Sequence, residues 1–397
     1  MRRIYVVTRC FNQSVLLLKI TSLAGIYIHI PFCRKACHYC DFHFSTSLLL
    51  VDEMVNAIVK EAELMKGYIQ EPVETIYFGG GTPSILSPAQ LEKITEALYK
   101  HFSINGSIEF TLEANPDDLS KSKLKDFASI GVNRLSIGTQ SFNDRVLQLL
   151  NRSHSVQQAI EAIENSKEVG ITNISLDLIY GIPDQNMNQW EVNLDQLTKL
   201  QPTHVSCYAL TIEERTVFGN WAKKGKLIPK EDKLTHEEYA FMVRYLETKG
   251  FEHYEVSNFA QPGYISKHNS SYWLQKSYLG LGPGAHSFNG EERHFTISNN
   301  PTYIKGIKNN QSVFSKERLT AKEKITEYIL TGIRTKWGID FKELEEQFGY
   351  EITQQHHSYI KSIVQLKLAN FVGNRLVLTS EGYFLSDSIA LELIPEP

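Results

Sequence analysis

The sequence predicts an α/β protein built on a parallel sheet, with a smaller α+β domain at its C-terminal end. Short apolar runs alternate with amphipathic helical segments between residues 25 and 211, as in repeated β-α units. The turn residues fit this alternation, because Gly131, Gly170 and Pro202 each stand between a helix and the next strand. Six right-handed parallel units of this length can form either a doubly wound sheet or a barrel that lacks two units.

The elements of these units follow one another at regular intervals along the chain. Strands are expected at residues 25–30, 75–78, 108–114, 134–138, 173–180 and 204–210. Helices, in which apolar residues recur at a helical spacing, are expected at residues 48–65, 87–102, 120–130, 155–169 and 188–200.

The remaining chain divides into two further parts. Residues 212–315 form a less regular middle region that contains a helix and several aromatic segments. Residues 316–397 are expected to fold as helices followed by a hairpin at 371–378 and a last helix, which is typical of a winged-helix-like domain. This part lacks a basic recognition face, so DNA binding is not expected.

The composition is that of an ordinary globular protein. Lys and Arg number 41 against 45 Asp and Glu, so the formal net charge of −4 indicates no general attraction to nucleic acid. No apolar run is long enough to cross a bilayer. Five cysteines, three of them in one loop, suit a reducing compartment, and we therefore expect a cytoplasmic protein. Residues 1–24, which include Cys10, are expected to be a dispensable extension.

Cys33, Cys37 and Cys40 lie within eight positions in the spacing C-x3-C-x2-C. Thiolates are the usual ligands of iron–sulfur clusters, and a loop of this length can wrap one side of a four-iron cluster. Three ligands leave one iron open to a small molecule. The alternatives are a zinc site, which normally takes four protein ligands, or cysteines without a shared role.

Polar residues and glycines recur where the predicted strands end. Gly79-Gly80-Gly81-Thr82 follows the second strand, and residues without side chains allow a ligand to approach the backbone. A carboxylate at a strand end can accept hydrogen bonds from ribose hydroxyls, and an arginine is a natural bidentate partner for a carboxylate. In open α/β folds, ligands bind at the carboxyl ends of strands. The residues concerned are Glu113, Gln140, Arg152 and Asp177.

The cysteine spacing resembles that of the radical S-adenosylmethionine (SAM) superfamily. Further motifs resemble the oxygen-independent coproporphyrinogen III oxidase family, among them Tyr-Ile-His-Ile-Pro-Phe-Cys, Gly-Gly-Gly-Thr-Pro, Glu-Ala-Asn-Pro, Gly-Thr-Gln-Ser-Phe and Asp-Leu-Ile-Tyr-Gly-Ile-Pro. The resemblance implies an open six-stranded (β/α)6 barrel whose first loop holds a [4Fe-4S] cluster, with SAM on the open iron. It also implies that Tyr39 stacks beside SAM and that the site is lined by Tyr27, Gly80, Gly81, Thr82, Glu113, Gln140, Arg152 and Asp177.

The family has an oxidase branch and a haem-carrying branch, and the sequence favours the second. Oxidases carry a further cysteine where this chain has Phe42, and they have a longer N-terminal arm. The haem-carrying branch has a motif H-N-x-x-Y-W, which His268, Tyr272 and Trp273 fit. A neutral imidazole is a common haem ligand, and the two rings offer flat faces to a porphyrin. Other candidate iron ligands are His29, His38, His43 and His286.

The resemblance therefore implies a haem chaperone that passes haem to acceptor proteins, expected to be respiratory proteins at the membrane. The alternative is anaerobic coproporphyrinogen III decarboxylation, in which a radical generated from SAM abstracts hydrogen from a propionate. A SAM-dependent enzyme with another substrate is a third reading. A homodimer and peripheral membrane association are both compatible with the sequence.

Overall fold

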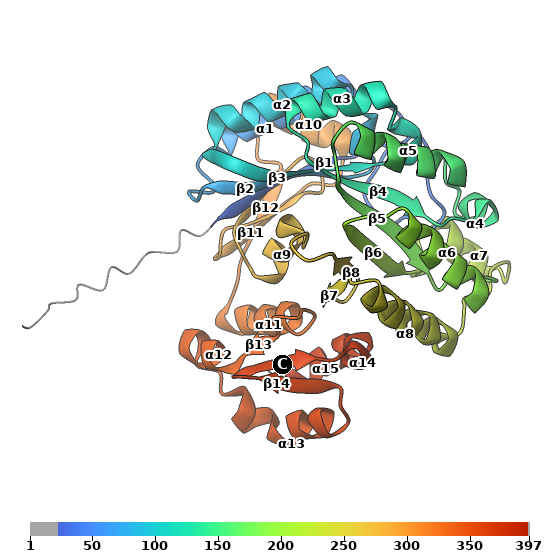
Figure 1. The fold of residues 1–397 in the computed structure, drawn as a ribbon. Helices are drawn as coiled ribbons and strands as arrows, with labels where there is room; N and C mark the ends of the chain where they lie inside the picture. Colours follow the sequence, from blue (N-terminus) through green and yellow to red (C-terminus); the bar gives the residue numbers. More distant parts are fainter. Residues whose placement is uncertain (1–22, 396–397) are drawn as a thin grey trace, which may run out of the picture.

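A curved twelve-stranded sheet forms the centre of the structure, a computed structural model in which residues 23–395 are described (Figure 1). Its middle strands are parallel, and neighbours in the sheet are also neighbours in the sequence. A doubly wound sheet would reverse its strand order, so this order identifies a partial barrel. The six strands are β1 (Ala24–Ile30), β2 (Val73–Gly80), β3 (Ile104–Ala114), β4 (Arg134–Gln140), β5 (Asn173–Tyr180) and β6 (His204–Ala209).

Helices cover the convex face of this sheet, as Figure 1 shows. Three of them begin with a capping box, in which Ser87, Ser155 or Asn186 exchanges hydrogen bonds with a glutamine three residues later. The expected helices are confirmed to within a few residues. They are α1 (Val51–Leu64), α2 (Pro88–His101), α3 (Lys121–Ile130), α5 (Val156–Glu168) and α6 (Met187–Lys199), and a short α4 (Asp144–Leu149) was not expected.

The middle region, expected to be irregular, extends the sheet at both edges. β9 (Tyr278–Leu281) pairs in parallel with β1, and antiparallel strands follow it: β10 (His286–Phe288), β11 (Glu292–Thr296) and β12 (Phe314–Arg318). At the other edge β6 is followed by β8 (Asn258–Ala260) and β7 (Glu252–Glu255). In residues 23–395 the sheet therefore ends at β12 and β7, and the barrel is open.

The helices of the middle region lie on different sides of the sheet. In Figure 1, α10 runs beside α1 on the convex side, whereas α9 lies within the concave side. The helices are α7 (Val217–Lys223), α8 (Asp232–Thr248), α9 (Lys267–Trp273) and α10 (Asn300–Lys308).

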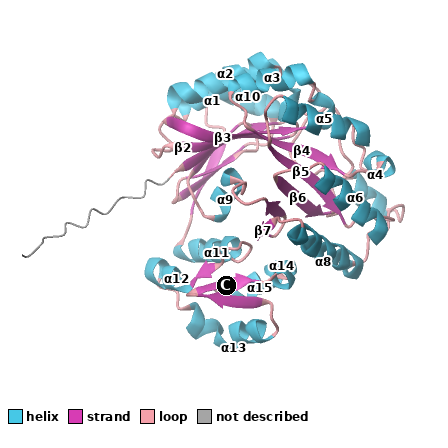
Figure 2. Cartoon of the chain, viewed as in Figure 1, coloured by secondary structure: helices cyan, strands magenta, loops and turns pink. Residues whose placement is uncertain are grey.

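The last part of the chain packs below the open side of the barrel (Figure 2). Its helices and hairpin agree with the expectation, and a third strand completes a small sheet of order β13-β15-β14. Backbone hydrogen bonds connect it to β7 and to the turn after β7. The Val256 N–H donates to the Arg334 carbonyl at 3.1 Å, and the Lys336 N–H donates to the Tyr254 carbonyl at 2.9 Å. The elements are α11 (Ala321–Gly332), β13 (Ile339–Asp340), α12 (Phe341–Phe348), α13 (Ile352–Gln365), β14 (Ala369–Val372), β15 (Arg375–Leu378), α14 (Ser380–Phe384) and α15 (Ser386–Leu393).

Two expectations concern the termini and the membrane. The extension at residues 1–24 lies outside the described residues except for its last two positions. None of the helices in residues 23–395 is long and apolar enough to cross a membrane.

Glu61 ties α1 to the middle region from within the core, where only 3% of the residue is exposed. Its carboxylate accepts hydrogen bonds from the backbone N–H of Gly282 at 2.7 Å and from the Tyr303 hydroxyl at 2.6 Å. Burial raises the pKa of Glu61 to about 7, although both hydrogen bonds act in the opposite direction.

We expect Glu61→Gln to weaken the pH dependence of folding stability. The folded protein binds the Glu61 proton more tightly than the unfolded chain, whose glutamates titrate near 4.5. The resulting stabilisation is present below that value and is lost as pH rises through 7; the shift corresponds to about 3 kcal/mol. Urea denaturation between about pH 5 and pH 8 should show a smaller fall in the free energy of unfolding for the variant than for the wild type.

The control is Glu63→Gln on the same helix. Glu63 is exposed, and its hydrogen bond and charge interaction with Lys60 lower its pKa, so it is ionised throughout this range. An unchanged pH slope in Glu61→Gln would contradict the assignment.

Candidate cofactor site at the barrel mouth

The cysteine loop leaves the carboxyl end of β1 and returns to it. Its base is closed by backbone hydrogen bonds from Cys33 to Ser45 at 3.0 Å and from Ser45 to Pro31 at 2.9 Å. Cys33, Cys37 and Cys40 are all free thiols and are partly exposed. The loop therefore presents three unpaired sulfur ligands at the barrel mouth, where the sequence predicted them.

Two side chains from other loops donate hydrogen bonds to these sulfur atoms. The Thr82 hydroxyl lies 3.4 Å from Cys33 Sγ, and an Arg152 nitrogen lies 3.3 Å from Cys37 Sγ. Partial burial raises the pKa of the Cys33 thiol to about 11 and also raises that of Cys40. Deprotonation here therefore needs positive charge nearby, which Arg152 provides in part and which a bound metal cluster would supplement.

The cysteines do not form a compact site for a single ion. In the part of the chain from 23 to 395, no three His, Cys, Asp or Glu side chains are grouped so that they could hold one metal ion. A structural zinc site would need four such ligands. Three free thiols on one loop, with donors directed at two of them, fit one side of a larger iron–sulfur cluster.

Arg152 joins the cysteine loop to the ends of β3 and β4. One of its terminal nitrogens donates to both Asn115 Oδ1 and the Gly138 carbonyl, each at 2.7 Å, while the other reaches Cys37. Its Nε is buried without a hydrogen-bond partner. This nitrogen is a buried donor without a partner within the protein, and an arginine donor of this kind is suited to an anionic ligand.

The glycine run at the end of β2 is required by packing. A methyl group on Gly80, whose φ is +108°, would lie 2.6 Å from the His29 ring, and one on Gly81 would lie 2.7 Å from the Phe32 carbonyl. Only glycine fits both positions without displacing neighbouring atoms. Contact between these glycines and SAM remains a prediction.

Two carboxylates lie deeper in the barrel, Glu113 on β3 and Asp177 on β5, which are the two strands that flank β4. Glu113 accepts hydrogen bonds from the Tyr77 hydroxyl at 2.7 Å and from the Gly80 N–H at 3.1 Å. Asp177 accepts one from Ser136 at 3.1 Å. Loss of hydration raises the pKa of Glu113 to about 7 and that of Asp177 to about 6. Both carboxylates can therefore change charge near neutral pH.

The other predicted SAM contacts surround the same mouth. Gln140 ends β4 with φ at +64°. A methyl group on Gly138 would lie 3.0 Å from the side-chain amide nitrogen of Gln140 and 3.0 Å from a terminal nitrogen of Arg152. Tyr39 packs against a small apolar cluster that includes Phe218 of α7. Tyr27 faces the interior, with its hydroxyl 3.0 Å from His29 Nδ1. The structure thus brings Thr82, Gln140 and Arg152 to the mouth beside the cysteine loop, whereas Tyr27 and Asp177 lie further back, in the middle of β1 and β5.

His268, on α9, lies inside the barrel and is 1% exposed. Its Nδ1 is 2.7 Å from the Thr75 hydroxyl and its Nε2 is 2.8 Å from the Tyr272 hydroxyl. Burial lowers the pKa of His268 to about 3, so the ring is neutral. Because both ring nitrogens are engaged, the imidazole in this conformation positions Tyr272 and has no free nitrogen for iron.

Three of the other histidines considered as iron ligands are also hydrogen-bonded. His29 Nε2 is 3.1 Å from the His43 carbonyl, His43 Nε2 is 2.8 Å from Asn300, and His38 Nδ1 is 2.9 Å from the Leu149 carbonyl. His286 is exposed on β10.

The sequence reasoning missed the polar residues that line the barrel. They include Thr75, Tyr77, Ser136 and the fully buried Arg134, whose Nε and one terminal nitrogen have no hydrogen-bond partner. A signal was present, because polar residues occupy every second position of several buried strands, as in Thr75 and Tyr77 or in Ser175 and Asp177.

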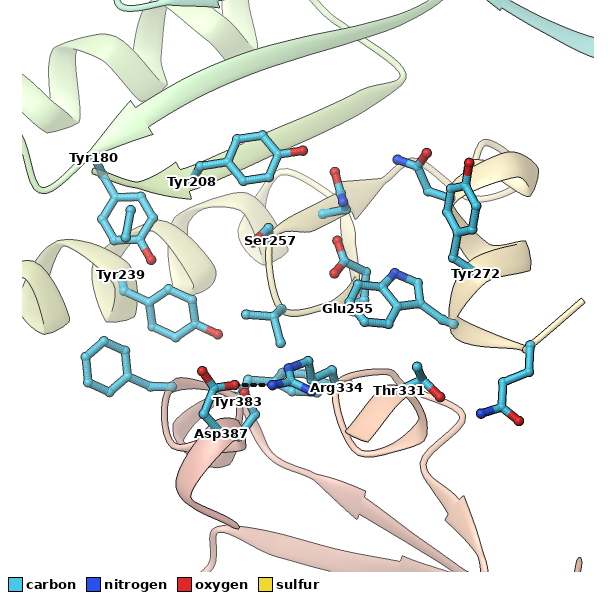
Figure 3. Close-up of a pocket in the computed structure, with 18 of the residues that line it drawn as sticks. Tyr180, Tyr208, Tyr239, Glu255, Ser257, Tyr272, Thr331, Arg334, Tyr383 and Asp387 are labelled. Carbon is cyan, nitrogen blue, oxygen red and sulfur yellow. Dashed lines mark hydrogen bonds and ion pairs between the residues drawn. The ribbon is translucent and has the colours of Figure 1, made fainter. Parts of the chain in front are cut away.

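A cavity of about 830 Å³ lies between the ends of β5 and β6 and the C-terminal part (Figure 3). Asn269, Tyr272 and Trp273 of α9 line one side of it. Figure 3 shows Tyr383, Asp387 and Arg334 on the opposite side, with Tyr180, Tyr208 and Tyr239 at one end. Asn269, Tyr272 and Trp273 of the H-N-x-x-Y-W motif thus face a large aromatic cavity, while His268 lies behind them.

Two family models and several known proteins match this chain. The radical SAM superfamily model matches residues 27–197, and the model of the HemN C-terminal domain matches residues 319–385. The chain is 34% identical over 365 residues to the haem chaperone HemW of Lactococcus lactis, covering 91% of this chain and 95% of that protein. It is 35% identical to the haem chaperone HemW of Bacillus subtilis, covering 92% and 98%.

The fold also has a counterpart among solved structures. The radical SAM enzyme coproporphyrinogen III oxidase (HemN) of Escherichia coli superposes with a TM-score of 0.81, over 94% of this chain and 90% of that chain. The two sequences are 21% identical, so this likeness shows the shared fold alone.

Proposed function

We propose that this protein is a haem chaperone. The chain belongs to the HemW family of the radical SAM superfamily. Membership of the superfamily implies a [4Fe-4S] cluster and SAM. The finer assignment of haem as cargo rests on one observation: Tyr272 and Trp273 of the H-N-x-x-Y-W motif open onto the 830 Å³ cavity.

The cluster and SAM fit the barrel mouth. Cys33, Cys37 and Cys40 would hold the cluster, which supplies an electron and an open iron position when bound. Arg152 directs one donor to Cys37 and keeps Nε for the carboxylate of SAM. Glu113 and Asp177 would accept hydrogen bonds from its ribose and amino groups. Tyr27, Tyr39, Gly80, Gly81, Thr82 and Gln140 would line the same site.

We propose that haem contacts the motif through Tyr272 and Trp273, and that His268 holds Tyr272 in place at 2.8 Å. His268→Ala is then expected to weaken haem binding roughly tenfold, as expected from the loss of one buried hydrogen bond. Tyr272→Phe should produce a similar loss, because it removes the same bond. Haem titration of anaerobically reconstituted protein, followed by absorption spectroscopy, measures both affinities.

The spectrum separates a positioning role from iron ligation. If His268 acts through Tyr272, both variants keep the wild-type haem spectrum, whereas a histidine ligand would make the spectrum of His268→Ala alone change. The control is His357→Ala, an exposed position on α13. Unchanged haem affinity in His268→Ala would contradict haem contact at this motif.

The oxidase reading is tested on the same preparation. A haem chaperone should not convert coproporphyrinogen III to protoporphyrinogen IX with stoichiometric cleavage of SAM. Phe42, which stands where oxidases have a further cysteine, is 74% exposed on the cysteine loop. Conversion at an enzymatic rate would replace the chaperone assignment by the oxidase one.

We further propose that the protein works in the cytoplasm, where thiols stay reduced, and that it delivers haem to respiratory acceptor proteins. Delivery could involve peripheral association with the membrane or a homodimer.

A further inference from the structure

We infer that the cavity between the barrel and the C-terminal part is the haem compartment, and that Arg293 of β11 and Arg334, two residues beyond the end of α11, bind the two haem carboxylates. This inference rests on the proposed function and adds to it the recognition of the propionate groups. Both arginines line the cavity, Arg293 from strand β11 and Arg334 from the turn that follows α11. Arginine is suited to this role because its planar guanidinium pairs with carboxylates through two hydrogen bonds.

The wall of the cavity suits a flat, largely apolar ligand. Nine of its residues are aromatic, and aromatic side chains provide apolar faces together with polar tips. A volume of about 830 Å³ lies within the range of small-molecule and cofactor sites. The aromatic residues are Tyr180, Tyr208, Tyr239, Tyr272, Trp273, Tyr278, Phe288, Tyr383 and Phe384.

Arg293 is held in place but keeps a donor available. One terminal nitrogen pairs with Glu327 at 2.7 Å, and its guanidinium carbon lies over the Phe288 ring at 5.2 Å. Its Nε is buried without a hydrogen-bond partner. A guanidinium fixed in this way, with an unused donor at a cavity wall, is prepared to bind an anion.

Arg334 is paired with a carboxylate that a ligand can replace. Its partner Asp387 has a side chain that is 79% exposed, whereas the Arg334 side chain is 22% exposed. Exposed ion pairs contribute little to stability. A haem propionate within the cavity can therefore take the place of Asp387 at low cost.

Unpartnered polar atoms provide an independent indication of a ligand. Besides Arg293 Nε, the Tyr239 hydroxyl, Glu255 Oε1 and Asn258 Oδ1 are buried without hydrogen-bond partners, and all four residues line this cavity. Native proteins pair nearly all buried polar groups. Their concentration around one space indicates that a polar or amphipathic molecule occupies it.

The test compares haem with haem dimethyl ester, in which both carboxylates are blocked. Reconstituted wild-type protein is expected to bind haem at least roughly tenfold more tightly than the diester, since hydrogen bonds to charged groups are the stronger ones. The double variant Arg293→Gln/Arg334→Gln should bind haem roughly tenfold to a hundredfold more weakly and lose the preference. Ala209→Trp, which narrows the cavity, should weaken both ligands.

The matched control is Arg318→Gln on β12, whose side chain is 78% exposed and does not line the cavity. It should retain wild-type affinity for both ligands. Equal wild-type affinities for haem and diester, or wild-type haem affinity in the folded double variant, would overturn the carboxylate assignment and leave the chaperone function standing. Absence of saturable haem binding in the wild type would instead refute the proposed function and, with it, this site.

Discussion

Cys37→Ala is expected to abolish assembly of the [4Fe-4S] cluster. Only three thiols are available on the loop, so removal of one leaves two ligands and a second iron without protein support. Cys37 is also the sulfur that accepts a hydrogen bond from Arg152, which ties the loop to β4. Anaerobic reconstitution followed by iron and sulfide analysis should give almost no cluster, where the wild type gives about one per chain.

The matched control is Cys207→Ala. Cys207 is buried in β6 and is 1% exposed, with no role in the cysteine loop. This variant should bind a full cluster, with a moderate loss of stability from the smaller side chain. A full cluster in Cys37→Ala would remove the loop from the assignment, while cluster loss in both variants would indicate a general effect on folding.

The second large effect is expected for SAM affinity in Glu113→Gln. The pKa of Glu113 is raised to about 7, so its carboxylate is ionised at pH 8 and largely protonated at pH 6. An ionised carboxylate is the stronger acceptor, and we expect wild-type affinity for SAM to fall roughly tenfold over this range. Glu113→Gln should bind SAM tenfold to a hundredfold more weakly at pH 8 and lose most of the pH dependence.

Isothermal titration of the cluster-loaded protein with SAM measures this effect. Asp177, whose pKa is raised to about 6, should account for the small pH dependence that remains. Glu164→Gln, at an exposed position on α5, is the control and should match the wild type. Strong, pH-dependent SAM binding in Glu113→Gln would place the SAM ribose elsewhere.

The β/α core could be predicted because each element carries a local signal. The helices have apolar residues at a helical spacing, and serine or asparagine caps with glutamine three residues later mark where three of them begin. The edge strands β7 to β11 are only three to five residues long. Their pairing depends on contacts far apart in the sequence, so periodicity could not reveal them.

The candidate site was predictable to a similar extent. Cysteine spacing and motifs predicted a group of site residues, of which the cysteines, Thr82 and Gln140 follow or end parallel strands and therefore share one edge of the sheet. Their contact with SAM stays a prediction. The fold was needed to show that α9 enters the barrel and that His268 lies between Thr75 and Tyr272. The fold was also needed to show that Arg334 lines the same cavity as Tyr180, which lies 154 positions earlier in the chain.

The pairing of residues 334–336 with the end of β7 also covers part of one edge of the sheet. β7 ends the sheet, and an exposed strand edge presents unpaired N–H and C=O groups to which another chain can add. Glu255 and Val256 instead meet Thr335 and Arg334 in a short backbone ladder. The part of the chain that completes the cavity thus also occupies backbone groups at the end of this edge strand, which are then not free to pair with another chain.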